Sequence, residues 1–250
     1  MVQYLKAGDE LDITKFGLGT FIVKFEMPMN FIDDINRIYD DAKELPKHNQ
    51  NLAGKIKDEL RVTEILTNDM KDCFWTCFRQ YLQVIGKPLW HCELAGAWIN
   101  DMKANEYNPF HYHQSTQSYL GLSSVLVLKR PSTYGVEYSR EETPCNGWLE
   151  FSGGQQDPLS IPQLRQDAQV GSLYIFPYTL LHGVYPFNGT DEIRRTLSYN
   201  CDLLTEHQKD ATNALTEKGL REGKIDPKSV VKRQWVAENK VSQAPQKQWK

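Results

Sequence analysis

The sequence lacks the features that would place it in a membrane, on a secretory route or on nucleic acid. Its 250 residues contain no run of about 18 apolar residues, so it has no candidate membrane span. The first residues, MVQYLKAGDELDI, lack the basic stretch followed by an apolar one that typifies a signal peptide. Lys and Arg number 29 against 32 Asp and Glu, a net charge of −3, which argues against nucleic acid as a partner.

Cysteine is scarce as well. The chain has five cysteines, an odd number without paired zinc-type spacing, as is typical of a protein of the reducing cytoplasm. Cys73 and Cys77 lie one turn apart in an expected helix with no third soft ligand nearby. We therefore interpret them as core residues rather than as a metal or redox site. Nothing in the sequence determines the oligomeric state.

The chain has no internal repeat and divides into a helical first part, a strand-rich middle and a polar tail. Apolar spacing predicts a strand over residues 17–23 and helices over 31–45, 62–85 and 207–221. Short strand-like runs lie between them, separated by Asn-Pro, Arg-Pro, Gly-Gly and Asn-Gly pairs. The expected strands cover residues 94–100, 119–128, 147–151, 172–176 and 194–201. This pattern predicts a mainly β fold with flanking α-helices, as a sandwich or jelly roll.

Three of the six histidines form a candidate metal site. His111 and His113 are two residues apart, so in an extended strand both rings point to one face. His182 follows a Gly171…Pro177 segment far along the chain, and an antiparallel sheet could bring it beside the first pair. Imidazole suits iron, zinc, copper or nickel, and three ligands leave positions open for substrate or water. The other histidines, in helix or loop contexts, are expected to be ordinary surface residues: His48, His91 and His207.

The strand expected after His182 has two chemically different faces. Alternation puts Arg194, Thr196 and Ser198 on one face, together with Asn200, and Arg195 on the other. A row of polar side chains must face water or a polar pocket. An arginine at the end of such a row presents a planar fork that suits a carboxylate.

With these motifs in order, the sequence resembles the 2-oxoglutarate- and Fe(II)-dependent oxygenases, closest to the members found in tailed-phage and marine bacterial genomes. The likeness covers about residues 51–203, and its most specific stretches are Trp98-Ile-Asn100 and Asn108-Pro-x-His111-x-His113. It implies a double-stranded β-helix, the cupin-like jelly roll. We expect one oxygenase-like domain over 1–224, with N-terminal strand and helices (1–89), jelly-roll core (90–204) and C-terminal helix (205–224). A basic polar tail (225–250) follows.

The resemblance also implies roles for individual residues. His111 and His182 match the two metal-binding histidines of the family. Arg194 matches the residue that holds the far carboxylate of 2-oxoglutarate, assisted by Ser198 or Thr196. Arg195 is the competitor for this role, and strand alternation favours Arg194. The cofactors so implied are Fe(II), 2-oxoglutarate as cosubstrate, and O₂.

The sequence departs from the superfamily at one position. Most members have His-x-Asp or His-x-Glu, whereas this chain has His113 at the second place. Either three histidines bind the metal, or a carboxylate comes from elsewhere, with Glu106 and Asp101 the nearest candidates. An all-imidazole site has one negative charge fewer and could favour another metal.

The expected reaction is hydroxylation of a C–H bond, with decarboxylation of 2-oxoglutarate to succinate. A protein side chain or a small amino-acid-like molecule is the favoured substrate, because the chain shows no basic groove motif. Residues that could line the substrate mouth are Trp98, Asn100, Tyr119 and Tyr174.

Three alternatives remain open. A cupin-type three-histidine metal enzyme would have the same histidines without 2-oxoglutarate, and it would have no need of Arg194. A zinc-hydroxide site for hydration or hydrolysis would also use three histidines. A non-catalytic jelly-roll binding protein would keep the architecture without the chemistry.

Overall fold

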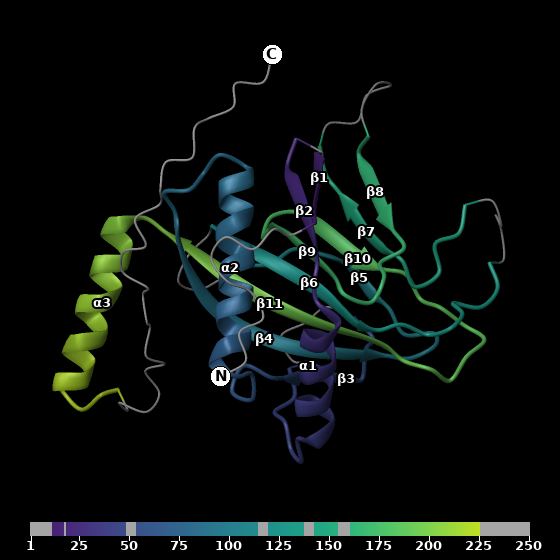
Figure 1. Ribbon diagram of the computed structural model, residues 1–250, viewed down its shortest axis with the longest axis horizontal. Coiled ribbons are helices and arrows are strands. Elements are labelled where there is room, and N and C mark those ends of the chain that lie inside the picture. Colours follow the sequence, from purple (N-terminus) through teal and green to yellow (C-terminus); the bar gives the residue numbers. More distant parts are fainter. Residues whose placement is uncertain are drawn as a thin grey trace. The chain divides into compact units, whose positions relative to one another are not determined.

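A computed structural model describes residues 12–17, 19–48, 54–114, 120–137, 143–154 and 161–225. Figure 1 shows the elements in chain order. The helices are α1 (Met29–Asp41), α2 (Asn68–Val84) and α3 (Glu206–Arg221). The strands are β1 (Ile13–Gly17), β2 (Phe21–Glu26), β3 (Asp58–Arg61), β4 (His91–Met102), β5 (Asn108–His111), β6 (Gly121–Lys129), β7 (Leu149–Ser152), β8 (Gln163–Gln166), β9 (Ser172–Pro177), β10 (Leu181–Val184) and β11 (Arg194–Leu204).

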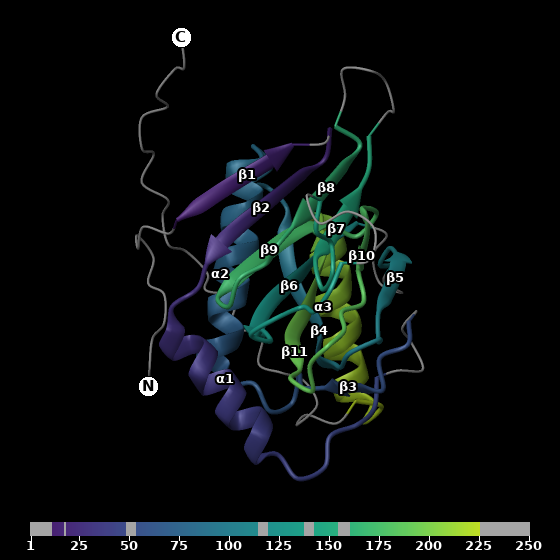
Figure 2. The same ribbon diagram turned by 90° about the vertical axis from the view of Figure 1, so that its right-hand side faces the viewer.

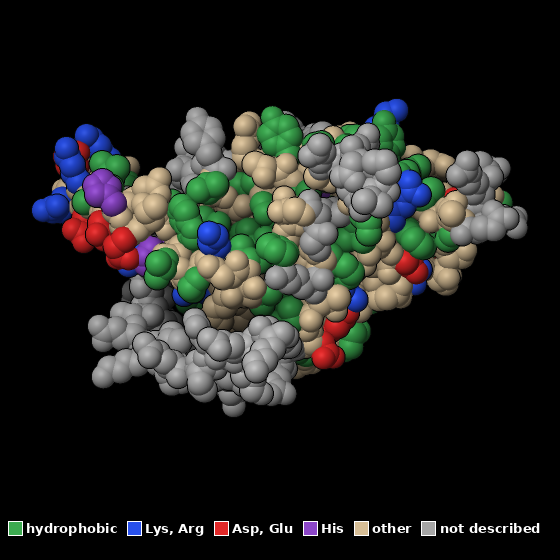
Figure 3. Space-filling model, turned by 90° about the horizontal axis from the view of Figure 1, so that it is seen from above, with side chains coloured by type: hydrophobic (Ala, Val, Ile, Leu, Met, Phe, Trp, Pro, Cys, Tyr) green, Lys and Arg blue, Asp and Glu red, His purple; other side chains and the backbone are tan. Residues whose placement is uncertain are grey.

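The chain separates into two compact units, residues 1–206 and residues 207–250. The first unit contains every strand named above together with α1 and α2. All of α3 except its first residue belongs to the second unit, and the helix carries both acidic and basic side chains (Figure 3). The predicted tail over 225–250 lies outside the described residues apart from its first position. None of the described helices is both long and apolar enough to cross a membrane.

The strands form two antiparallel sheets, as the mainly β prediction requires. The large sheet has the order β1-β2-β9-β6-β11-β4-β3, and the small sheet the order β5-β10-β7-β8. Apolar side chains from both sheets meet in one cluster, which includes Val125 and Tyr174 from the large sheet and Phe151 from the small one. The two sheets therefore pack face to face, with a core between them.

Helices α1 and α2 cover the other face of the large sheet (Figure 2). In α2 the buried residues recur at helical spacing, with Cys73, Phe74 and Cys77 among them. Phe74 contacts Phe31 of α1 and Tyr199 of β11, with ring centroids 5.6 Å and 5.2 Å apart. This second core fixes the large sheet from behind, so that its inner face is held in place for the site.

Some predicted elements have different boundaries, for identifiable reasons. The strand expected over 17–23 is wrong, because a turn at Gly19, with φ of 74°, separates β1 from β2. The helix expected over 62–85 begins only at Asn68, because the Thr67 side chain caps it by accepting from the Met70 N–H at 3.2 Å. The strands β3, β5, β8 and β10 were not predicted. Each has four residues, too few to show a clear alternation.

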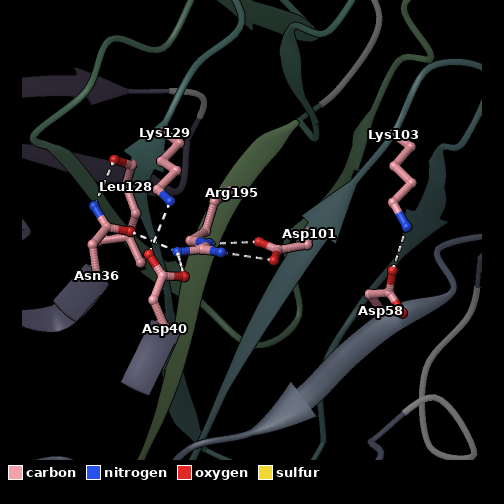
Figure 4. A network of polar contacts seen from close by, with 8 residues as sticks. All are labelled: Asn36, Asp40, Asp58, Asp101, Lys103, Leu128, Lys129 and Arg195. Carbon is pink, nitrogen blue, oxygen red and sulfur yellow. Dashed lines mark hydrogen bonds and ion pairs between the residues drawn. The ribbon is translucent and has the colours of Figure 1, made fainter. Parts of the chain in front are cut away.

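Arg195 joins α1 to the centre of the large sheet (Figure 4). Its guanidinium donates to both carboxylate oxygens of Asp101 on β4, at 2.6 Å and 2.9 Å. It also donates to Asp40 at 2.7 Å and to Asn36 at 3.1 Å, both on α1, and lies 4.5 Å from the ring of Tyr39. The Arg195 side chain is 5% exposed and that of Asp101 14%, so the pair is nearly dry.

We expect the substitution Arg195→Met to lower the free energy of unfolding by about 3–5 kcal/mol, because it leaves the Asp101 carboxylate buried without its partner. Denaturant titration of the full chain measures this loss. Lys103→Met is the matched control, because Lys103 pairs with Asp58 where both side chains are about half exposed. Loss of such a surface pair should cost about 0–1 kcal/mol. Equal losses in the two variants would contradict the structural role of Arg195.

Candidate metal centre and cavity

The structure brings the three predicted histidines together. His111, at the end of β5, is the cross-strand partner of His182 in β10. His113 lies just beyond β5, where its backbone N–H donates to the carbonyl of Tyr178 at 2.9 Å. One ring nitrogen from each histidine lies within 4.8 Å of the others. Among the described residues this is the group of His, Cys, Asp or Glu side chains that could hold a metal ion.

Backbone carbonyls orient two of the rings. The Nδ1 atom of His111 lies 2.8 Å from the carbonyl oxygen of Pro109, and Nδ1 of His182 lies 2.9 Å from that of Leu180. Since a carbonyl only accepts, both Nδ1 atoms carry the proton and both Nε2 atoms keep a free lone pair. The Nε2 atoms of His113 and His182 lie 3.1 Å apart.

The three imidazoles are neutral. Burial, followed by the neighbouring His111 and His48, lowers the pKa of His113 to about 3. Burial, together with His113 and His111, holds the pKa of His182 well below its usual value. Burial also lowers the pKa of His111. Neutral imidazole is the form that binds metal.

This geometry fits a divalent ion. Two imidazole nitrogens at right angles, each about 2.1 Å from an ion, would lie about 3 Å apart. The 3.1 Å separation between His113 and His182 agrees with that spacing. Because Nε2 of His182 carries no proton, the two atoms can lie this close when Nε2 of His113 donates a proton to it or when a cation lies between them. The residues therefore fit a metal that accepts imidazole ligands.

Neither carboxylate candidate joins the histidines. Asp101 points toward the helices and binds Arg195. Glu106 accepts from the backbone N–H groups of Lys57 at 3.3 Å and Lys103 at 2.9 Å, and so stabilises its own loop. Within the described part of the chain, the candidate ligand set is three imidazoles.

Gly183, next to His182, allows β10 and β5 to approach closely. A Cβ atom at this position would lie 2.9 Å from the carbonyl oxygen of Asn108 and 3.1 Å from the amide nitrogen of Phe110. Both of these atoms are backbone, so neither can move alone. Only glycine fits between these strands at the observed spacing.

A cavity opens beside the histidines, between the two sheets. Its polar and apolar lining comes from β4, β5, β6, β7, β10, β11 and the segment after β5. The lining residues are Trp98, Asn100, Asn108, His111, His113, Val125, Leu149, His182, Val184, Thr196 and Ser198.

The two neighbouring arginines of β11 lie on opposite faces, as alternation predicts. Thr196 and Ser198 line the cavity, and Arg194 has the same phase, whereas Arg195 binds α1 and β4. Arg194 is 2% exposed, and its Nε and Nη2 atoms have no hydrogen-bond partner among the described residues. Tyr134 is its hydrogen-bonding neighbour, and no carboxylate is among the groups acting on it. A buried guanidinium with free donors fits an anionic ligand.

The residues predicted to line the substrate mouth have different positions. Trp98 and Asn100 line the cavity. Tyr174 is 1% exposed and lies in the core between the sheets, with its ring 6.1 Å from that of Phe151. Tyr119 lies outside the described residues.

Two residues near the cavity were not predicted from the sequence. The ring of His48, expected to be an ordinary surface residue, lies 4.9 Å from that of Trp98, which is 5.8 Å from the ring of His113. Glu59 on β3 is 3% exposed and pairs across the strands with Asn100. Neither has a local sequence signal, because both reach the cavity wall only through the pairing of β3 with β4.

Glu59 is an unusual carboxyl group. Its Oε1 atom is buried without a hydrogen-bond partner among the described residues. Burial, followed by the charge of Glu106, raises the pKa of Glu59 from 4.5 to about 7. The group is therefore poised between its neutral and charged forms near neutral pH.

Comparison with known proteins shows which family the central part of the chain resembles and which structures share its fold. Residues 96–200 match the model of the family described as "Putative 2OG-Fe(II) oxygenase". The fold is similar to that of a prolyl-4-hydroxylase from Pseudomonas putida, with 12% identity, a TM-score of 0.50, and coverage of 72% of this chain and 91% of that one. It is also similar to the non-heme alpha ketoglutarate dependent epimerase SnoN from nogalamycin biosynthesis, with 13% identity, a TM-score of 0.50, and coverage of 72% and 78%. None of the curated proteins matches the sequence.

Residues 96–200, less than half of the chain, thus match the model of the 2-oxoglutarate- and Fe(II)-dependent oxygenases, and the fold is the double-stranded β-helix of the similar structures. The resemblance seen in the sequence is confirmed. The cofactors of this family are Fe(II) and 2-oxoglutarate, and the three histidines form the group that could bind the iron.

We expect Glu59→Gln to change how stability depends on pH. Between pH 4.5 and about 7 the folded chain keeps a proton on Glu59 that the unfolded chain releases, so wild-type stability falls as pH rises through this window. A shift of this size corresponds to about 3 kcal/mol, reached above pH 7. The variant, which cannot ionise at this position, does not have this loss.

Thermal unfolding of both proteins from pH 4 to pH 8 measures the effect, and the advantage of the variant should grow across the window. Asp58→Asn is the control, because Asp58 is adjacent but about half exposed. Parallel curves for wild type and Glu59→Gln would show that Glu59 titrates normally.

Proposed function

We propose that this protein is a 2-oxoglutarate- and Fe(II)-dependent dioxygenase that hydroxylates a C–H bond of a protein side chain or a small amino-acid-like molecule. The observation that carries the proposal is that a group of three histidines and a buried arginine both lie on the cavity side, between the two sheets. One ring nitrogen from each of the three histidines converges beside a cavity, and the buried Arg194, on the same face by strand alternation, has two guanidinium nitrogens without a partner among the described residues. The family match of residues 96–200 supports the same assignment.

His111, His113 and His182 would hold the iron through Nε2, with the backbone carbonyls of Pro109 and Leu180 keeping two of the rings in orientation. Three neutral imidazoles leave the full charge of the ion uncompensated. That charge favours an anionic cosubstrate in the open positions.

Arg194 would bind the far carboxylate of 2-oxoglutarate, and the hydroxyls of Thr196 and Ser198 can donate to the same molecule. Together with O₂, the bound iron and 2-oxoglutarate supply the oxidising chemistry that inserts one oxygen atom into a C–H bond and yields succinate and CO₂. The apolar side chains of Leu149 and Val184 exclude water from the cavity. Trp98 and Asn100, which line the cavity, would contact the substrate.

A three-histidine metal enzyme of the cupin type, without 2-oxoglutarate, is the second candidate. It is favoured by the absence of a carboxylate from the histidine group within the described residues. Arg194 distinguishes the two, since a cupin has no use for a buried guanidinium with two nitrogens that lack a partner among the described residues.

The extent of the domain and its setting are part of the proposal. We assign residues 1–224 to one oxygenase domain with a small-molecule or protein substrate, and residues 225–250 to a basic tail. All five cysteines are free and four are buried, which supports a reducing, cytoplasmic setting.

We expect the purified chain, under anaerobic conditions with Fe(II) and 2-oxoglutarate, to develop a visible charge-transfer absorption band. Admission of O₂ should then produce succinate, measured by chromatography. A tightly retained zinc ion with neither band nor succinate would contradict the oxygenase assignment.

The variant His113→Ala tests the unusual ligand in the same assay. We expect it to bind Fe(II) at least tenfold more weakly, because one of three ligands is lost. His207→Ala is the control, because His207 is exposed on α3. Unchanged metal affinity in His113→Ala would show that His113 is not a ligand.

We expect Arg194→Ala to weaken 2-oxoglutarate binding by about tenfold to a hundredfold, the usual contribution of a hydrogen bond to a charged group. Metal content should stay the same. Anaerobic calorimetry measures the dissociation constants of 2-oxoglutarate and of Fe(II). Arg37→Ala, which removes an exposed arginine paired with Asp34, should bind 2-oxoglutarate like wild type. Equal affinities in wild type and Arg194→Ala would remove Arg194 from the site.

A further inference from the structure

One end of the cavity wall carries hydrogen-bond acceptors without donors. Asn100 is 6% exposed and Glu59 is 3% exposed. The Oδ1 atoms of Asn100 and Asn108 and the Oε1 atom of Glu59 are buried and have no partner among the described residues. A buried acceptor left without a donor costs about 1–3 kcal/mol, and more when it is charged. Two of these residues, Asn100 and Asn108, line the cavity, and Glu59 is on the strand paired with Asn100, so the three atoms together indicate a ligand that brings donors with it.

Strand pairing directs Glu59 to the cavity side of the sheet. Glu59 on β3 is the cross-strand partner of Asn100 on β4, and Asn100 lines the cavity. Directly paired residues project from the same face of a sheet, so the two side chains are neighbours. Asp58, one residue earlier, projects to the opposite side, where it pairs with Lys103 near solvent.

The charges around Glu59 leave a net negative end to the wall. Glu106, 8% exposed, acts on Glu59 as a like charge, and its carboxylate accepts from the backbone N–H groups of Lys57 and Lys103. Two of the basic side chains near Glu59 pair with other carboxylates, Arg61 with Glu64 and Lys103 with Asp58. A cationic ligand would neutralise this end of the cavity.

An aromatic surface adjoins the acceptors. Trp98 lines the cavity beside Asn100, and its ring lies between those of His48 and His113, at 4.9 Å and 5.8 Å. Among aromatic side chains tryptophan binds cations most strongly over its ring face. The wall thus combines a carboxylate, two amide oxygens and an indole.

We propose that the cavity binds a substrate bearing a protonated amine or a guanidinium, with Glu59 as the specificity-determining residue and Asn100 and Asn108 accepting from the same group. The proposal deepens the proposed function, because it names the class of molecule to be hydroxylated: a lysine-like or arginine-like side chain, free or within a peptide. Its recognition does not depend on whether iron or 2-oxoglutarate is bound.

Calorimetry with matched probes tests the proposal. The cationic probes are L-lysine, L-arginine and a heptapeptide of glycines with one central lysine and with both termini blocked. Their neutral counterparts are L-norleucine, L-citrulline and the same peptide with norleucine. Each is titrated into the full chain, once with Fe(II) and 2-oxoglutarate under anaerobic conditions and once without either.

We expect at least one cationic probe to bind wild type about tenfold or more tightly than its neutral counterpart, as a charged hydrogen bond would give. The preference should largely disappear in Glu59→Gln, which keeps the shape and removes the charge. Asn100→Ala should also reduce it. Asp58→Asn, which removes an equal charge from the opposite face, should keep the full preference. The free amino acids and the peptide distinguish a small substrate from a protein one.

Several outcomes would overturn the proposal. The proposal is wrong if the cationic and neutral probes bind equally, or if none of them binds. That result is expected if water alone hydrogen-bonds to Glu59. A preference that survives in Glu59→Gln, with the variant folded by its thermal transition, would also overturn it. A cation preference in a chain that forms no charge-transfer band would leave this inference standing and refute the oxygenase function. A charge-transfer band and succinate without a cation preference would refute this inference and leave the oxygenase function standing.

Discussion

The alternation of side chains along β11 is the constraint on which both the fold and the site depend. Arg195 faces α1, where it binds Asp40 and Asn36, and also binds Asp101 of the neighbouring strand. Arg194 faces the interior with free donors. Because the side-chain period of a strand is two residues, a shift of one position would exchange these roles. The same ladder with β4 then places Thr196 opposite Asn100 and Ser198 opposite Trp98, so the polar cavity wall follows from one register.

Much of this arrangement follows from local sequence. Residues 194–201 show alternating polar and apolar positions, so the face of each arginine could be predicted before any pairing was known. The His111-x-His113 pair and the distant His182 could be predicted as one cluster, because few histidines occur and their neighbours are distinctive. The long apolar periodicity of α2 likewise predicts the helix, and only its start differs, where Thr67 provides the cap.

The rest depends on contacts between distant segments. Glu59 lies in a four-residue strand whose sequence, DELR, has no feature that distinguishes a buried carboxyl from an exposed one. Its burial results from pairing with β4, and its pKa is raised first by that burial and then by the charge of Glu106, which is far from it in the chain. His48 reaches Trp98 through the same region. Such residues cannot be identified from one sequence, because their environment is made by tertiary structure alone.

The close contact at Gly183 has a consequence for the choice of ion. His111 and His182 are paired across β5 and β10, so the distance between their rings follows the distance between two backbones. A side chain at residue 183 would press on the backbone of β5 and separate these strands. If the three imidazoles hold a metal, the spacing of His111 and His182 limits the radius of the ion that they accept. That spacing depends on the Cβ atom that Gly183 lacks, although Gly183 itself offers no ligand. Metal selectivity in this chain would then be a property of its backbone spacing as much as of its ligands.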